Sequence, residues 1–172
     1  MILNNKTKRI IVYIVGLFIL ALGLTLNTKA SLGVSPIISV PYSISQITEL
    51  NFGDLTFIEY ALFVFVEIMI HLSEKNKKKI VADLLQLPLS LVFTRLLNIF
   101  SACIPTSSIF LVQLLILVLA IICTGIGAAM SLSMQLVPNP GDGIVQALAG
   151  KFNKSVGLTK NMFDCLSVCI TL

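Results

Sequence analysis

The chain has 172 residues, of which 56% are hydrophobic and only 12% carry charge, and its mean hydropathy is +0.99. The charged share is about half of that in a typical soluble domain, so water alone cannot solvate the apolar surface of such a chain. The net charge of +4 does not indicate nucleic-acid binding, because the charges lie in short clusters between apolar runs. Composition excludes a water-soluble domain and predicts an all-α, polytopic transmembrane helical bundle in a lipid bilayer.

The apolar runs predict about five long membrane spans. The first, residues 10–28, is free of charge and is long enough to cross about 30 Å of hydrocarbon. It is too long for the apolar region of a secretory signal, so we interpret it as a retained helix. The other long spans are predicted at residues 55–72, 80–103, 109–134 and from 158 onward, with a break at Gly53 and Asp54 before the second span.

Two short apolar segments, residues 35–48 and 139–152, lie between the spans. Each opens with Ser or Asn followed by Pro, the residue types that favour the N-cap and the first position of a helix. Each is therefore predicted as a short half-helix. A helix N-terminus inside a membrane can attract a polar substrate, although the simpler interpretation of Asp142 is that it caps its own helix. The candidate substrate or ion site consists of Ser35, Pro36, Asn139, Pro140 and Asp142.

Ionisable residues are rare inside the predicted spans. A charge at the centre of a bilayer costs at least about 2.5–3.5 kcal/mol, so each of these side chains should face protein or water. They either relay protons or ions or form structural ion pairs, and the sequence leaves both interpretations open. Arg95 lies deepest, and its expected partner is Glu59. The intramembrane charges are Glu59, Glu67, Asp83, Arg95 and Asp164.

The basic residues predict the orientation of the chain. If the N-terminus is cytoplasmic and neither short segment crosses, almost all of the 12 Lys and Arg residues lie on the inner side. Only Lys29 then lies outside, and only Arg95 lies within a span. This distribution follows the positive-inside rule, so we predict a multi-pass protein of the bacterial inner membrane with a cytoplasmic N-terminus.

The chain aligns with itself without gaps at an offset of 104 residues. Gly23 then meets Gly127, and Pro36 meets Pro140. The order of elements also repeats: a long span, a short segment that begins with Pro, and another span. Each full unit has an odd number of crossings, so the second unit enters from the opposite face, which is an inverted-topology repeat.

We predict a single membrane domain, residues 1–172. Repeat unit one covers about residues 5–104, and repeat unit two covers about residues 109–172. Unit two is incomplete, because Leu172 aligns with Ile68 in the middle of a span. The sequence therefore leads us to expect a truncated form of a six-span protein.

Three short motifs resemble the YczE/YyaS/YitT family of bacterial multi-pass membrane proteins. They are TKASLGVSP at residues 28–36, DLLQLP at residues 83–88 and NPGDGI at residues 139–144. The resemblance implies a membrane location and a helical fold, but no substrate. Members of that family often carry Trp and Asp after the first Pro, where this chain has Ile37 and Ile38.

The sequence contains no catalytic, metal-binding or cofactor-binding motif. It lacks a phosphate-binding loop and a nucleophile elbow, and its cysteines lack zinc-ligand spacing. We therefore expect no enzyme and no cofactor. Two functions remain: a small-solute transporter or transport-related protein whose half-helices line a midplane site, or a membrane scaffold or accessory protein that acts through a partner. Expected partners are the lipid bilayer, a second copy or another membrane protein, and an unidentified small molecule.

Overall fold

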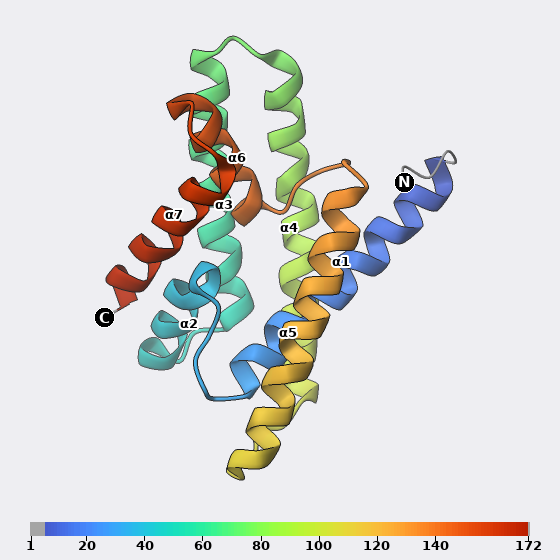
Figure 1. Cartoon of the computed structure of the whole chain (residues 1–172), viewed down its shortest axis with the longest axis vertical. Coiled ribbons are helices and arrows are strands. Elements are labelled where there is room, and N and C mark those ends of the chain that lie inside the picture. Colours follow the sequence, from blue (N-terminus) through green and yellow to red (C-terminus); the bar gives the residue numbers. More distant parts are fainter. Residues whose placement is uncertain (1–5, 172) are drawn as a thin grey trace. The chain divides into compact units, whose positions relative to one another are not determined.

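The computed structural model describes residues 6–171, and in this part of the chain seven α-helices are joined by short loops, with no β-strand (Figure 1). Four helices are long and apolar enough to cross a membrane: α1 (Lys6–Lys29), α3 (Phe52–Ser73), α4 (Lys77–Cys103) and α5 (Phe110–Ser133). Three helices are shorter: α2 (Pro36–Thr48), α6 (Pro140–Phe152) and α7 (Val156–Thr171). The all-α prediction is confirmed, and the apolar helices are those of a multi-pass membrane protein.

The fifth predicted span corresponds to α7, whose 16 residues fall short of the roughly 20 that a crossing helix needs. Four described helices therefore qualify, and the fifth crossing stays a prediction. The predicted break at Gly53 and Asp54 was wrong, because the side chain of Asn51 caps α3 and accepts a hydrogen bond from the Gly53 amide at 3.1 Å. Both residues consequently lie in the first turn of the helix.

The chain divides into two compact units, each built from two separate stretches. Unit 1 comprises Met1–Ser35 and Phe93–Leu136, and unit 2 comprises Pro36–Val92 and Val137–Leu172. These units differ from the predicted repeat units, because each compact unit combines a stretch from both parts of the chain. Helix α4 begins in unit 2 and ends in unit 1.

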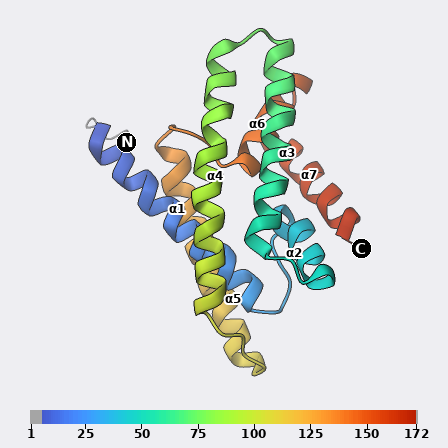
Figure 2. The same cartoon turned by 180° about the vertical axis from the view of Figure 1, so that it is seen from behind.

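In unit 1, α1 and α5 pack against each other in antiparallel directions (Figures 1 and 2). A Cβ atom at Gly23 would meet the backbone of Thr124, and one at Gly127 would meet the backbone of Leu20. Later residues of α1 therefore contact earlier residues of α5, as expected for antiparallel helices. Glycine at both positions lets the two backbones approach closely, which is a common way of packing helices in membranes.

In unit 2, the two short helices pack against α3 and α7. Helix α3 contacts α2 and α6, and α7 contacts the same two helices. The centre of the unit is formed by fully buried side chains that include Ile38, Tyr60, Val64 and Val145. This packing brings the N-terminal turn of α6 against the middle of α3.

Candidate functional site

Buried polar side chains of unit 2 gather where α3 meets the first part of α4. Helix α3 contributes Glu67 and His71, and α4 contributes Asp83 and Gln86. The spacings of four and three residues place each pair on one helix face. All four side chains are buried, and Glu67 and Gln86 are each only 1% exposed. We call these four residues the α3–α4 polar cluster.

Two hydrogen bonds join the helices within this cluster. The Nε2 of Gln86 donates to the Oε2 of Glu67 at 2.7 Å. The Nδ1 of His71 and the Oδ2 of Asp83 lie 2.6 Å apart. Buried polar groups need such partners, because an unpaired group in an apolar interior is costly. The cluster therefore holds α3 and α4 together through specific polar contacts.

Two oxygens of the cluster have no partner among the described residues: Oε1 of Glu67 and Oε1 of Gln86. The Glu67 carboxylate also lies against the first turn of α6. A Cβ atom at Gly143 would be 2.7 Å from both oxygens of Glu67, so the absence of a side chain at this position allows the carboxylate to pack directly against α6. The cluster thus presents unpaired acceptors at the start of a half-helix.

The start of α6 was predicted at the right residue, but one capping contact differs. Asn139 is the N-cap, and its backbone carbonyl accepts hydrogen bonds from the amides of Asp142 and Gly143 at 2.9 and 2.8 Å. Its side chain makes no capping bond. The Nδ2 of Asn139 instead donates to the hydroxyl of Tyr60 on α3 at 3.3 Å, so a contact between helices replaces the expected local one.

The predicted site residues of the first half-helix lie in different units. Ser35 ends the first stretch of unit 1, where its amide donates to the Oδ1 of Asn27 at 2.8 Å, and Pro36 opens α2 in unit 2. Within unit 2, the N-terminal turns of α2 and α6 meet. The side chain of Ile37 occupies the space beside Gly141, where a Cβ atom would otherwise lie.

Asp142 lies in the first turn of α6, as the sequence predicted. It is partly buried, and this burial raises the pKa of its carboxyl above the ordinary value. The nearby Lys160 ammonium opposes this rise in pKa, and the Asp164 carboxylate adds to it. The structure therefore places Asp142 near Asp164, another residue singled out in the sequence.

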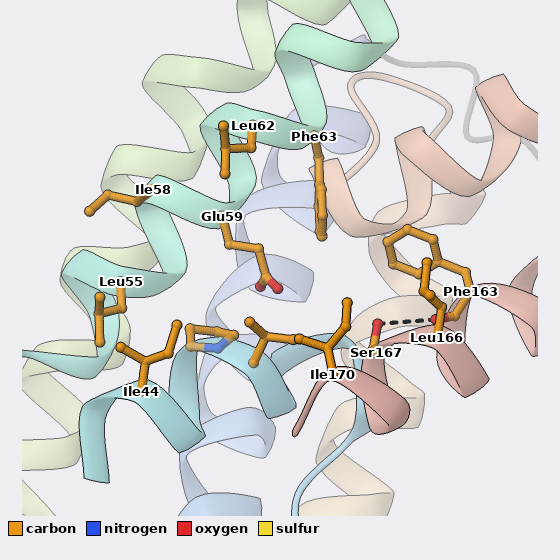
Figure 3. Close-up of a pocket in the computed structure, with 12 residues that line it drawn as sticks. Ile44, Leu55, Ile58, Glu59, Leu62, Phe63, Phe163, Leu166, Ser167 and Ile170 are labelled. Atoms are coloured by element: carbon orange, nitrogen blue, oxygen red, sulfur yellow. Dashed lines mark hydrogen bonds between the residues drawn. The ribbon is translucent and has the colours of Figure 1, made fainter. Parts of the chain in front are cut away.

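Glu59 borders an apolar cavity of about 310 Å³ that is lined by α2, α3 and α7 (Figure 3). The rings of Phe63 and Phe163 meet edge to face on one side, with centroids 5.4 Å apart. The Oε2 of Glu59 is buried without a hydrogen-bond partner among the described residues. The expected pairing of Glu59 with Arg95 stays a prediction, because Arg95 belongs to unit 1.

Sequence reasoning selected Glu67 and Asp83 but missed their partners. His71 and Gln86 were not assigned a role, and Gly143 was noted only as part of a motif. One signal was available for Gln86, because a polar residue three positions after Asp83 repeats the same face of an otherwise apolar helix.

Residues 7–172 match the model of DUF6198, a family of unknown function. No curated protein and no solved structure matches the chain. The resemblance to the YczE/YyaS/YitT family stays a prediction, because the family match does not connect to it. Since the match covers nearly the whole length, the chain belongs to DUF6198.

Proposed function

We propose that this protein is a multi-pass transporter of the bacterial inner membrane, built from inverted repeats, with α2 and α6 lining a substrate or ion site. One observation carries the proposal. The N-terminal turns of two half-helices meet inside unit 2, and Glu67, buried and with one unpaired oxygen, lies against one of them. Discontinuous helices whose ends meet at buried polar groups are typical of transporter sites.

The helix boundaries support the repeat. An offset of 104 residues moves α1 (Lys6–Lys29) to residues 110–133, which are the bounds of α5. The same offset moves α2 (Pro36–Thr48) to residues 140–152, the bounds of α6, and it moves the first residue of α3 to the first residue of α7. Helix boundaries are set by local capping and proline residues, so this agreement does not depend on apolar composition alone.

The contacts within each unit support the same symmetry. The offset exchanges the α3–α6 contact with the α2–α7 contact, and the α2–α3 contact with the α6–α7 contact. In unit 1, Gly23 lies against Thr124 and Gly127 lies against Leu20. The offset converts the first of these contacts into the second. Reciprocal contacts of this kind are the mark of a two-fold axis. Because α1 and α5 are antiparallel, that axis runs across the helices, as an inverted repeat requires.

The charge distribution supports the proposed orientation. The turn between α3 and α4 carries Lys75 and is followed by Lys77, Lys78 and Lys79 at the start of α4. The N-terminal turn of α1 is also basic. If α1 and α3 each cross the membrane and α2 does not, the start of α1 and the turn after α3 lie on the same side. The positive-inside rule assigns that side to the cytoplasm.

A cysteine accessibility experiment tests the proposal. The four native cysteines are first replaced by Ala, and Pro36→Cys and Asp142→Cys are then made singly. A small, water-soluble, membrane-impermeant thiol reagent is added to right-side-out and to inside-out vesicles. Lys78→Cys, an exposed position in the first turn of α4, is the positive control. Leu115→Cys on α5 is the lipid-facing control, since this side chain is 58% exposed and lies in an apolar span.

A transporter that opens to each side in turn predicts reaction at Pro36→Cys and Asp142→Cys from both sides. If neither position reacts from either side while Lys78→Cys reacts, the centre of the protein is dry and transport through it is refuted. That result would favour the alternative function, a membrane scaffold or accessory protein that moves no solute.

A further inference from the structure

We infer that the α3–α4 polar cluster binds a monovalent cation, a proton or Na⁺, on Glu67 and Gln86 beside Gly143. The inference names the coupling ion of the transporter proposed above, and in that respect it rests on the proposed function. Cation binding itself is a property of the cluster, and it can be measured without any substrate.

The two unpaired atoms of the cluster, Oε1 of Glu67 and Oε1 of Gln86, are both oxygens that accept hydrogen bonds, and both are buried. The Gln86 amide already donates one hydrogen bond to Oε2 of Glu67, at 2.7 Å. Two acceptors without donors call for a proton or a metal cation, whereas an anion would face the carboxyl groups of Glu67 and Asp83.

Glu67 makes no ion pair in the described part of the chain. The groups that face it are Asp83 and Gln86 from α4, His71 from its own helix, and Gly143 from α6 with Asp142 next to it. The imidazole of His71 is already bonded to Asp83, and the charge of Asp83 acts on Glu67. A carboxylate so placed in an apolar span needs one positive charge.

Gly143 lets both carboxylate oxygens of Glu67 lie directly against the backbone of α6, because a Cβ atom at this position would be only 2.7 Å from each of them. The available ligands are carboxylate and amide oxygens, which suit hard cations. No group of three or more His, Cys, Asp or Glu side chains within residues 6–171 suits a metal ion, and this argues against a multivalent metal.

Thermal unfolding of the full chain in lipid nanodiscs tests the inference. One arm follows the Tm across pH in choline chloride. The other compares NaCl with choline chloride at equal ionic strength and high pH. A proton held more tightly by the folded than by the unfolded state makes the Tm fall as pH rises. A Na⁺ site makes NaCl raise the Tm, because ligand binding stabilises the folded state.

Glu67→Gln removes the titrating group while keeping its shape, so it should remove the part of the pH response that Glu67 contributes in the first case and abolish the NaCl response in the second. Glu59→Gln is the matched control, because Glu59 is a second carboxyl on α3 with an unpaired buried oxygen but without an amide partner. It should retain the NaCl response of the wild type and the part of the pH response that Glu67 contributes. Gly143→Ala keeps the carboxylate but adds a Cβ atom that displaces it, so it should weaken the response that depends on Glu67.

If Glu67→Gln does not fold, Gly143→Ala against Gly150→Ala supplies the same comparison, since a Cβ at Gly150 meets nothing within 4 Å. Wild-type responses to pH and NaCl that survive both Glu67→Gln and Gly143→Ala would overturn the inference, as would a wild type that responds to neither. A cation response combined with unreactive Pro36→Cys and Asp142→Cys would refute transport and leave cation binding intact.

Discussion

The two compact units bury different kinds of side chains. In unit 1, the buried polar residues are all hydroxyl-bearing: Thr25, Thr28, Thr94 and Ser131. In unit 2, the buried set includes Glu67, His71, Asp83 and Gln86. Unit 1 is held together by backbone proximity at glycines, whereas unit 2 places polar groups that must satisfy one another. Helices in lipid associate through these two means, and buried carboxyl, imidazole and amide groups are used in unit 2.

The separation indicates where function and where stability reside. A close contact at glycine requires only shape, and it tolerates no added atom. A buried polar cluster costs stability unless it is fully paired, so an incompletely paired cluster is the stronger candidate for a functional site. Substitutions in the two units should therefore destabilise the protein for different physical reasons.

The largest effect is expected at the His71–Asp83 pair. His71→Leu leaves the Asp83 carboxylate buried without its partner, and breaking a buried pair in this way lowers the free energy of unfolding by about 3–5 kcal/mol. Chemical denaturation in mild detergent measures the loss. Leu72→Ala, an exposed neighbour, is the control. The double substitution His71→Leu with Asp83→Leu should recover much of the stability. A His71→Leu protein as stable as the control would show that the pair does not stabilise unit 2.

The next effect is expected in unit 1. Gly127→Ala adds a Cβ that meets the backbone of Leu20, and backbone cannot rotate away as a side chain can. Overpacking of this kind costs about 1–3 kcal/mol, which should appear as a lower Tm. Gly125→Ala on the same helix meets nothing within 4 Å and serves as the control. Equal Tm values for the two variants would show that α1 and α5 do not depend on close backbone contact.

A smaller effect is expected at Gly143. Its added Cβ meets the end of the flexible Glu67 side chain, which can move aside at the expense of its bond to Gln86. Losing one such hydrogen bond costs about 0.5–1.5 kcal/mol of the free energy of unfolding. Gly150→Ala should not destabilise the protein, because the added Cβ meets nothing within 4 Å and alanine favours a helix over glycine. Denaturation of the two proteins side by side measures the difference. A larger loss than at Gly127 would reverse the ranking of the two units.

The smallest effect is expected at the surface. Lys79 and Glu74 form an exposed ion pair at 3.3 Å near the turn between α3 and α4. Exposed pairs contribute about 0–1 kcal/mol, so Lys79→Ala should leave the Tm nearly unchanged. A loss comparable to that of His71→Leu would mean that charge in this region matters irrespective of burial.

The positions of the helices could be predicted from the sequence, because hydropathy and proline mark them locally. Pro36 and Pro140 open α2 and α6 as expected. The start of α4 was placed three residues late, at residue 80, since hydropathy detects apolar residues and not the helical turn formed by Lys77, Lys78 and Lys79. Hydropathy therefore predicts the apolar part of a helix better than its charged ends.

The polar cluster could be predicted only in part. Glu67 and Asp83 stand out because charges are rare in apolar spans. Their partners His71 and Gln86 depend on how α3 and α4 face each other, and Gly143 depends on how α6 packs against α3. These are contacts between helices, and local sequence patterns do not encode them.

The meeting of Ile37 and Gly141 restricts how these positions can vary. The end of the Ile37 side chain fills the volume beside Gly141, so a bulkier residue at position 141 would require a smaller one at position 37. Across the family, the combined volume of the two residues should therefore stay nearly constant while each residue varies, and exchanging the two residues should be tolerated better than enlarging Gly141 alone.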